Sequence, residues 1–325
     1  MIDFNKPVSS DNRNFRKEDS GIKAHFDAVE KEAALFPKKN GVIVDAELVI
    51  FSDCPVCGLG RHDQLFTKYG FVHVQCKNCN HVFVWNRLRE SVLLDLYSKS
   101  IADELSSVRR QHHAGLDSYW TRIYEKYSAY LSNCNINNVN LLDVGCGAGH
   151  FLSFCKKHTS FNLHGIDFCE HSYEFLSGII GKNYYFKKTL EKIEFDKAFG
   201  IITLWGVFEH LYNPREVLKK CKKILDRHGR ILILVPNLFS RAFAILGITN
   251  PTLNPRAHIN FYTRRSMEYL CHSIGLSIEH VFQELPVIDL MYDYIDYNEQ
   301  LVESILNKEE AYYHVYILKN GEGDK

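Results

Sequence analysis

The chain has 325 residues, 46% of them apolar, and 39 basic against 39 acidic side chains, which gives a formal net charge of zero. This length allows one large domain and one small domain with a substantial core. The balanced charge argues against a nucleic-acid partner, because phosphate binding depends on a basic surface. No N-terminal apolar segment resembles a signal peptide, and no apolar run approaches the ~20 residues of a membrane span. We therefore expect a cytoplasmic protein without a membrane segment, whose ten cysteines are reduced.

Three regions follow one another along the chain. Residues 1–46 are highly charged, and we expect them to be partly disordered, with one short helix at 23–36. Residues 47–90 hold four clustered cysteines between strand-like runs, which indicates a small separate subdomain. Residues 91–325 begin with a helical pattern and then alternate short apolar runs with helical ones. That alternation is typical of βαβ units and predicts an α/β domain with a mostly parallel sheet.

The predicted strands of the large domain are short apolar runs, at 139–144, 162–167, 183–188, 198–205, 230–235, 276–282 and 311–318. Helices are predicted between them, at 148–158, 170–180, 214–228 and 264–274. Asn213 and Pro214 favour the start of the third helix and Gly229 its end, and Thr263 can cap the fourth, which Gly275 ends. Residues 236–257 fit no standard connection, and we expect this insertion to cover the substrate.

The cysteine cluster has the spacing C-x2-C-x18-C-x2-C, formed by Cys54, Cys57, Cys76 and Cys79. This spacing is typical of a tetrahedral zinc site. Four thiolates leave no open coordination position, so the metal is expected to be structural. The alternative is two incidental C-x-x-C pairs at the surface. The nearby histidines are interpreted as bystanders, at positions 62, 73 and 81.

A glycine loop follows the first predicted strand of the large domain and contains Gly145, Cys146, Gly147 and Gly149. A dinucleotide site would favour G-x-G-x-x-G. The G-x-G-x-G spacing still permits a tight turn and the close approach of a ligand to the backbone. Asp167 ends the next strand, where a carboxylate can accept hydrogen bonds from both ribose hydroxyls. Phe168 can cover the face of an adenine.

Asp143 precedes the glycine loop and can place negative charge beside a cationic ligand. The ammonium and sulfonium groups of S-adenosylmethionine suit such a position. No Arg or Lys lies in the loop to meet a pyrophosphate. The residues therefore favour S-adenosylmethionine over a nicotinamide cofactor.

Glu209 and His210 follow the fourth predicted strand, in the stretch "WGVFEHLYNP". Ligands of such sheets bind at the carboxyl ends of the strands, so the pair lies at the expected edge. Methyl transfer to oxygen or carbon usually needs a base, and histidine is suited to this near neutral pH. We interpret His210 as the base and Glu209 as a participant, with His258 as a rival base. The structural alternative is that these side chains only hold the loop and the start of the next helix.

Four stretches between residues 139 and 283 occur in the order and spacing of a known family: "LLDVGCGAGHF", "GID", "FGIITLWGVFEHLYNPREVLKKCKKILDRHGRILILVPN" and "HINFYTRRSMEYLCHSIGL". They resemble the class I S-adenosylmethionine-dependent methyltransferases, in the branch of ubiquinone-type and sugar methyltransferases. The cysteine cluster is similar to the N-terminal zinc-binding domain of deoxysugar C-methyltransferases. This resemblance implies a Rossmann-like, seven-stranded methyltransferase sheet.

The resemblance also implies roles for particular residues. Related sugar methyltransferases use a histidine at the position of His210. The further cofactor contacts expected are Tyr97, Leu190, Leu204 and Trp205. Gly206 departs from the family pattern, which often has an acid there.

Three functions are consistent with these features. The first is methylation of oxygen or carbon in a small molecule, such as a nucleotide sugar, a natural-product intermediate or a polysaccharide intermediate. The second is an RNA methyltransferase whose zinc module grips RNA. Residues 54–81 contain only Arg61, Lys68 and Lys77 as fixed cations, which disfavours it. The third is a binding module without turnover, which the intact glycine loop and Asp167 disfavour.

Overall fold

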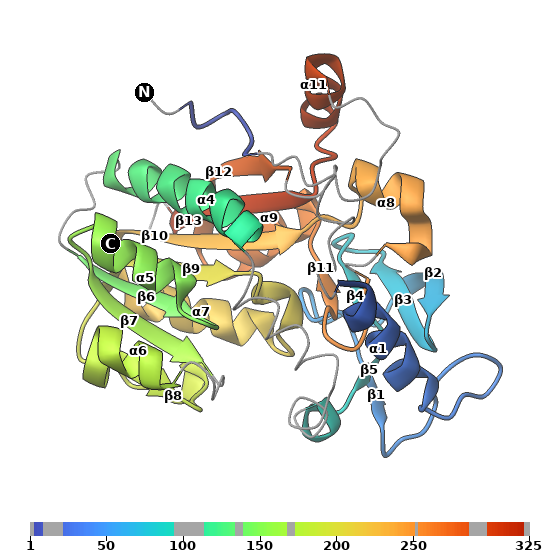
Figure 1. Cartoon of the computed structure of the whole chain (residues 1–325). Coiled ribbons are helices and arrows are strands. Elements are labelled where there is room, and N and C mark those ends of the chain that lie inside the picture. The colour runs from blue at the N-terminus through green and yellow to red at the C-terminus, as the bar shows by residue number, and fades with distance from the viewer. Residues whose placement is uncertain are drawn as a thin grey trace.

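The computed structural model describes residues 3–8, 22–93, 114–133, 139–167, 173–250, 253–285 and 298–321. Its largest element is a seven-stranded sheet with the order β12-β13-β10-β9-β6-β7-β8 (Figure 1). The strands are β6 (Asn140–Val144), β7 (Asn162–Asp167), β8 (Tyr184–Phe186), β9 (Phe199–Trp205), β10 (Leu225–Pro236), β12 (Leu276–Glu284) and β13 (Tyr313–Asn320). The prediction of a seven-stranded α/β sheet is confirmed.

The central strands of this sheet run parallel to one another. Parallel pairing joins β10 to β9, β9 to β6, β6 to β7 and β7 to β8. β13 runs antiparallel to both of its neighbours, β10 and β12. The carboxyl ends of β6, β7 and β9 therefore meet at one edge, where their following loops lie close together.

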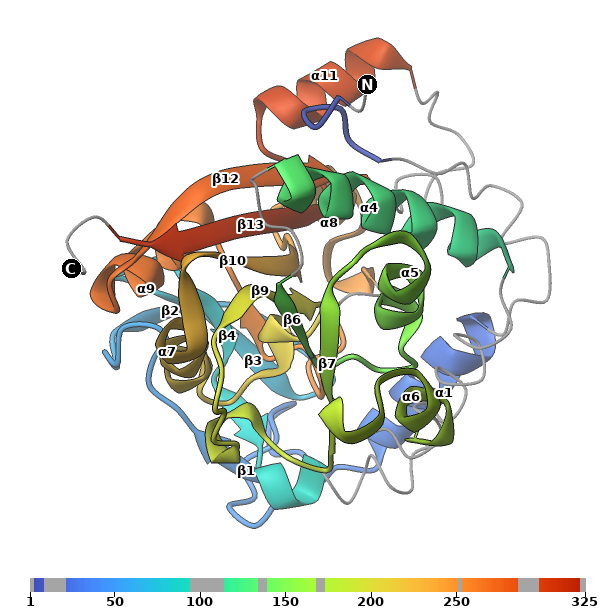
Figure 2. The ribbon, with the colours of Figure 1, turned by 90° about the vertical axis from the view of Figure 1, so that its left-hand side faces the viewer.

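Helices cover both faces of the sheet (Figure 2). One face is covered by α4 (Ala114–Asn133), α5 (His150–His158) and α6 (Tyr173–Ile180), and the other by α7 (Pro214–Ile224) and α9 (Arg264–Ser273). Successive strand residues point to opposite faces, so Leu141 and Ile201 pack toward α4 and α5 while Leu142 and Ile202 pack toward α7 and α9. Strands buried on both faces explain the continuous apolar runs in the sequence.

The cysteine-containing region forms a second sheet with the order β11-β4-β3-β2. Its first three strands in sequence are β2 (His62–Lys68), β3 (Phe71–Cys76) and β4 (Val82–Val84). The edge strand β11 (Asn260–Phe261) comes from a later part of the chain, beyond β10, and Asn260 pairs with Phe83. A two-stranded sheet of β1 (Val49–Phe51) and β5 (Asn86–Leu88) lies beside them.

The two sheets share one hydrophobic core. Val72 and Val74 of β3 belong to the same buried cluster as Ile202 and Leu204 of β9. This shared burial, together with the pairing of β11 with β4, fixes the cysteine region against the large sheet. The predicted domain limits at residues 46/47 and 90/91 stay predictions.

Two predicted local features differ from the structure. The helix predicted to reach Gly229 ends at Ile224, because Leu225 is already the first residue of β10 and pairs with Phe199 of β9. The register between the two strands shifts between Leu225 and Arg230. Asn213 stands at the N-cap of that helix, but its side chain makes no capping hydrogen bond. The cap predicted for α9 is present, with Thr263 accepting a hydrogen bond from the main-chain amide of Ser266.

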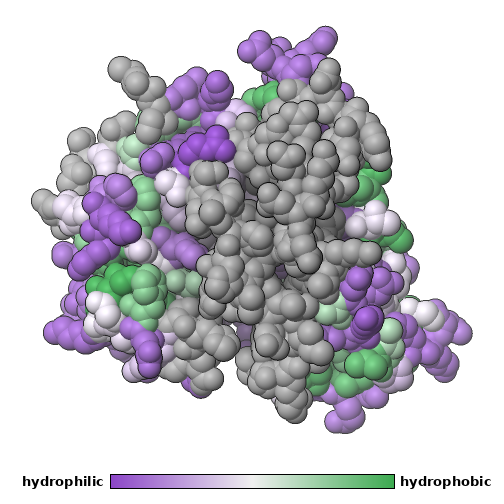
Figure 3. All heavy atoms as spheres, viewed as in Figure 1, coloured by the Kyte–Doolittle hydropathy of each residue, from purple (hydrophilic) through white to green (hydrophobic). Residues whose placement is uncertain are grey.

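Three further α-helices lie among the described residues. α1 (Ile22–Ala34) agrees with the short helix expected near the N-terminus, α8 (Arg241–Leu246) lies inside the insertion at 236–257, and α11 (Glu299–Asn307) precedes β13. Hydrophobic side chains gather at the surface over α8 (Figure 3), where Phe239, Ile245 and Ile248 are about half exposed. Within the described residues, no helix has both the length and the apolar composition to span a membrane.

Candidate active site

The glycine loop begins directly after β6, and all three of its glycines have positive φ angles, 71° at Gly145, 52° at Gly147 and 75° at Gly149. A Cβ atom at Gly145 would lie 2.4 Å from Val207, and one at Gly149 would lie 2.4 Å from Leu176. Those two glycines therefore allow close packing. Among the described residues, a Cβ atom at Gly147 would meet nothing within 4 Å, so the middle of the loop leaves space there that a ligand can approach.

Asp167 lies against this loop at the end of β7. Its Oδ2 atom accepts a hydrogen bond of 2.6 Å from the amide of Gly147. The amides of Gly145 and Cys146 also bond to the carbonyl oxygen of Ile166, at 2.8 and 3.1 Å. The loop is thus folded onto the carboxyl end of β7, and the predicted glycines and acid come together. Phe168 and Tyr97, which were predicted to contact the cofactor, lie outside the described residues.

Asp143 occupies a buried position on β6. Only 2% of it is exposed, and its Oδ1 atom accepts a hydrogen bond of 2.7 Å from the Thr203 hydroxyl. Burial raises the pKa of Asp143 to about 8, so the protonated form is favoured at neutral pH. Its predicted role beside a cationic ligand stays a prediction. Thr203 was not predicted from the sequence. The signal that could have indicated it is a hydroxyl side chain within an otherwise apolar strand.

The other predicted cofactor contacts divide between the two faces of the sheet. Leu190 and Leu204 are buried in the cluster that includes α7, whereas Cys146 is buried in the cluster under α4 and α5. Trp205 joins the second cluster, where its ring contacts Tyr124, Tyr127 and Phe151 at centroid distances of 5.7, 5.8 and 5.1 Å. Because Leu204 and Trp205 are consecutive strand residues, they point to opposite faces.

Glu209 and His210 lie on a single 3₁₀ turn, η5 (Phe208–His210), that follows β9. Gly206 opens the turn with a φ angle of 63°, which a residue with a side chain rarely adopts. Glycine suits this backbone conformation. Val207 then packs against Gly145, so the turn and the glycine loop are in contact.

The carboxyl group of Glu209 is enclosed by the protein. Only 3% of the residue is exposed, and within the described residues its Oε2 atom has no hydrogen-bond partner. Burial raises the pKa of Glu209 to about 8. A buried carboxyl oxygen without a partner is costly, and such groups often lie at functional sites.

The predicted rival base lies beside the predicted base. The ring centroids of His210 and His258 are 4.7 Å apart in an edge-on arrangement. His210 Nδ1 lies 2.9 Å from the carbonyl oxygen of Ala257. Glu209, His210 and His258 each place one potential ligand atom within 4.8 Å of the others. The structure therefore unites the three residues proposed for proton transfer.

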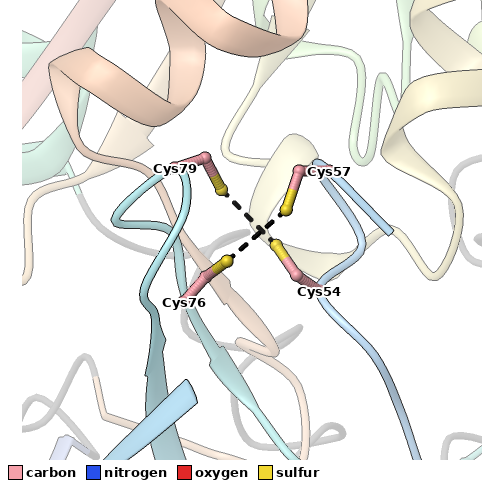
Figure 4. Close-up of side chains that lie close together, drawn as sticks. All are labelled: Cys54, Cys57, Cys76 and Cys79. Carbon is pink, nitrogen blue, oxygen red and sulfur yellow. Dashed lines mark hydrogen bonds between the residues drawn. The ribbon is translucent and has the colours of Figure 1, made fainter. Parts of the chain in front are cut away.

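The four cysteines of the small sheet converge on one point (Figure 4). The Sγ atoms of Cys54 and Cys79 are 3.5 Å apart, those of Cys57 and Cys76 are 3.4 Å apart, and all four lie within 4.8 Å of one another. Tetrahedral zinc with Zn–S bonds of ~2.3 Å would separate the sulfur atoms by roughly 3.8 Å. The spacing of the sulfur atoms fits such an ion.

The two C-x-x-C turns have the same backbone geometry. In the first, the Gly58 amide bonds to the Cys54 carbonyl at 2.8 Å, and in the second the Asn80 amide bonds to the Cys76 carbonyl at 3.0 Å. Gly58 and Asn80 both have positive φ angles, 75° and 60°. Two matched turns that aim their thiols at one point are the local structure a four-thiolate metal site requires.

A mixed seven-stranded sheet with a glycine loop and an acid on adjacent strands defines the class I S-adenosylmethionine-dependent methyltransferase fold. Residues 111–281, more than half of the chain, match the family model described as a methyltransferase domain. The chain belongs to this methyltransferase domain family.

Individual relatives are more distant. The chain is 28% identical over 127 residues to a ubiquinone biosynthesis O-methyltransferase of Rickettsia akari (strain Hartford), covering 38% of this chain and 50% of that protein. It is 28% identical over 123 residues to a tRNA U34 carboxymethyltransferase of Nautilia profundicola, covering 36% and 41%. The chain thus spans about half the length of the curated relatives it matches, or less.

Among solved structures, the chain is similar to the 1,6-didemethyltoxoflavin-N1-methyltransferase of Burkholderia thailandensis, which was crystallised with 1,6-didemethyltoxoflavin and S-adenosylhomocysteine. The TM-score is 0.49 and the sequence identity 13%, and the match covers 80% of this chain and 100% of the other.

Proposed function

We propose that this protein transfers a methyl group from S-adenosylmethionine to a small-molecule acceptor at the Glu209–His210 turn. The contact between Gly145 and Val207 is the observation that carries this proposal, because it joins the cofactor loop to the turn that bears the proposed base. Membership of the methyltransferase domain family supports the reaction type. The O-methyltransferase name of one relative supports an oxygen acceptor, and a carbon acceptor is the other candidate.

The proposed cofactor site consists of the glycine loop and Asp167. Gly147 leaves room for a ligand at the backbone, and the Asp167 carboxylate lies beside it to accept hydrogen bonds from ribose hydroxyls. When bound there, S-adenosylmethionine supplies a methyl group activated by its sulfonium. The protein's own contribution is to align the acceptor and to remove its proton.

His210 is the proposed proton acceptor. A carbonyl oxygen can only accept a hydrogen bond, so the contact with Ala257 places the proton of neutral His210 on Nδ1. The lone pair then lies on Nε2, which takes the proton from the acceptor hydroxyl or C–H group. Glu209 and His258 are proposed to shape this site, and His258 remains the rival base.

We also propose that Cys54, Cys57, Cys76 and Cys79 hold a structural zinc ion. The matched turns and the separations of the sulfur atoms support it. Four thiolates would fill the coordination sphere, so this ion would stabilise the fold rather than take part in the reaction. The insertion at 236–257, whose exposed apolar residues lie over α8, is proposed to cover the acceptor.

Two measurements test the proposed function. Native mass spectrometry of the purified protein should detect one bound S-adenosylmethionine or S-adenosylhomocysteine. The protein is then incubated with methyl-labelled S-adenosylmethionine and, separately, with a metabolite pool and an RNA pool. We expect label in the metabolite pool. Label in RNA alone would establish the RNA methyltransferase alternative, and cofactor binding without any transfer would establish the binding-module alternative.

A further inference from the structure

Asn260 connects the cysteine cluster to the Glu209–His210 turn through its side chain. The residue is 1% exposed and lies on β11. Its Oδ1 atom is 3.2 Å from Nε2 of His81, and its Nδ2 group donates a hydrogen bond of 2.7 Å to the carbonyl oxygen of Leu211. Because the amide oxygen accepts, His81 is the donor in the first bond. The oxygen and the nitrogen of one buried side-chain amide are therefore both hydrogen-bonded, one to the cysteine region and the other to the turn.

The partner on the cysteine side is part of the metal-binding turn itself. His81 follows Cys79 by two residues, and its carbonyl oxygen accepts a hydrogen bond of 2.9 Å from the amide of Cys76. Its ring is fully buried and packs against Tyr262, with centroids 4.8 Å apart. The position of His81 thus depends on the fold of the second C-x-x-C turn.

The segment next to Asn260 holds the turn by further bonds. The amide of Ile259 donates to the carbonyl of Glu209 at 3.0 Å, while the carbonyl of Ile259 accepts from the amide of Val84 at 3.0 Å. The Tyr262 hydroxyl donates to the carbonyl of Phe208 at 3.3 Å, and the two rings stack with centroids 4.8 Å apart. Residues 259–262 therefore lie between β4 and the turn and contact both.

We propose that Asn260 is a positioning residue that fixes the main chain after His210 and so sets the direction of the His210 imidazole. Without its side chain, the Leu211 carbonyl and the His81 ring each lose a buried partner, and the turn can relax to regain one. The inference rests on the proposed role of His210. The cysteine region would then help to align the active site, in addition to its proposed role in stability.

The test measures the NMR signal of His210 directly and does not require the methyl acceptor to be known. The full-length protein is labelled with ¹³C at histidine Cε1 and saturated with S-adenosylhomocysteine, and the His210 resonance is assigned from its loss in His210→Gln. We expect Asn260→Ala and the isosteric Asn260→Asp to move this resonance, because both lack the donor to Leu211. The affinity for S-adenosylhomocysteine, measured by calorimetry, should stay within about twofold of wild type, since the glycine loop and Asp167 are unchanged.

Asn86→Ala is the matched control. Asn86 is a fully buried asparagine of the same region, but its side chain bonds to Val72, Ile43 and Gly70 rather than to the turn. It should lower stability and leave the His210 resonance in place. Should Asn260→Ala fail to fold, Asn260→Asp decides. A folded Asn260 variant with an unmoved His210 resonance, or an equal shift in Asn86→Ala, would overturn the inference.

The same samples separate this inference from the proposed function. If S-adenosylhomocysteine does not bind to the wild-type protein, the proposed function fails while the link from Asn260 to His210 is still read from the ligand-free spectra. Once an acceptor is identified, Asn260→Asp should lower kcat at least tenfold with an unchanged KM for S-adenosylmethionine. A loss confined to KM would contradict a positioning role.

Discussion

His210 Nδ1 lies 2.9 Å from the carbonyl oxygen of Ala257, which joins the turn after β9 to the end of the insertion at 236–257. The bond fixes the tautomer of neutral His210 and limits rotation of its ring. It also brings the proposed base next to His258, the residue after Ala257. Two segments that are remote in the sequence therefore meet at the proposed acceptor site.

His258→Gln should preserve most of the activity if His210 is the base. The imidazole of His210 keeps its bond to the main chain at Ala257, which the substitution leaves in place. We expect kcat to fall less than about tenfold, below the 10²–10⁴-fold range for loss of a general base. Steady-state kinetics with the identified acceptor measure this. A fall beyond a hundredfold, with cofactor affinity retained, would transfer the role of base to His258.

Gly147→Ala should lower mainly the ligand affinity, whereas Gly149→Ala should lower mainly the stability. At Gly147 the added Cβ meets no atom of the described residues, so stability should fall by only about 1–2 kcal/mol from the positive φ angle. The affinity for S-adenosylhomocysteine should fall about tenfold. At Gly149 the Cβ would lie 2.4 Å from buried Leu176, and the unfolding free energy should fall by about 2–4 kcal/mol.

Urea unfolding and calorimetry distinguish the two glycine variants. If Gly147→Ala binds S-adenosylhomocysteine with wild-type affinity, the ligand does not approach the loop at this position. A Gly149→Ala protein as stable as the wild type would show that Leu176 can move aside without cost.

The stability of the protein should fall with rising pH through the titration of Glu209. Its folded-state pKa is raised from 4.5 to about 8 by burial, so the folded state keeps a proton that the unfolded state has already released. Between these two values, each pH unit removes up to about 1.4 kcal/mol of the unfolding free energy. Asp143, raised from 3.8 to about 8, acts in the same direction.

Glu209→Gln isolates the Glu209 share of this pH dependence. We expect the unfolding free energy of the variant to decline less steeply between about pH 5 and pH 8, by up to about 1.4 kcal/mol per pH unit. Urea unfolding at several pH values measures the two slopes. Parallel slopes for the variant and the wild type would show that Glu209 is ionised in the folded protein at neutral pH.

Cys76→Ser should remove the proposed zinc ion and destabilise the fold. One zinc ion per chain is expected in the wild type by elemental analysis, and loss of a thiolate ligand should lower the melting temperature by several degrees because the two C-x-x-C turns are no longer joined. Cys271→Ser is the control, since Cys271 is a buried core residue of α9. It should retain the zinc. Equal zinc content in both variants would contradict the proposed ligand set.

The strands and helices of the large sheet could be predicted because their signals are local. The buried runs at β6, β7 and β9 and the cap at Thr263 depend on neighbouring residues, and they appear within one or two residues of their predicted limits. The early end of α7 could not be predicted, because the pairing of Leu225 with Phe199 overrides the helical pattern. The end of α7 is therefore set by strand pairing in the folded protein and not by the local sequence.

The site was predictable only in part, for the same reason. Glu209, His210 and His258 stand out by residue type, and the structure brings them together. Asn260 gives no such signal, because its importance comes from the pairing of β11 with β4, which lie far apart in the sequence. The bond between Asp143 and Thr203 could not be predicted either, because it arises from the register between β6 and β9.

The most direct test of the account is a methyl-transfer assay with the wild type and His210→Gln, both loaded with methyl-labelled S-adenosylmethionine and supplied with the same metabolite pool. We predict that the wild type labels a small molecule, while the variant binds the cofactor with wild-type affinity and transfers label at least a hundredfold more slowly. Equal transfer rates in the two proteins would contradict methyl transfer with His210 as the base.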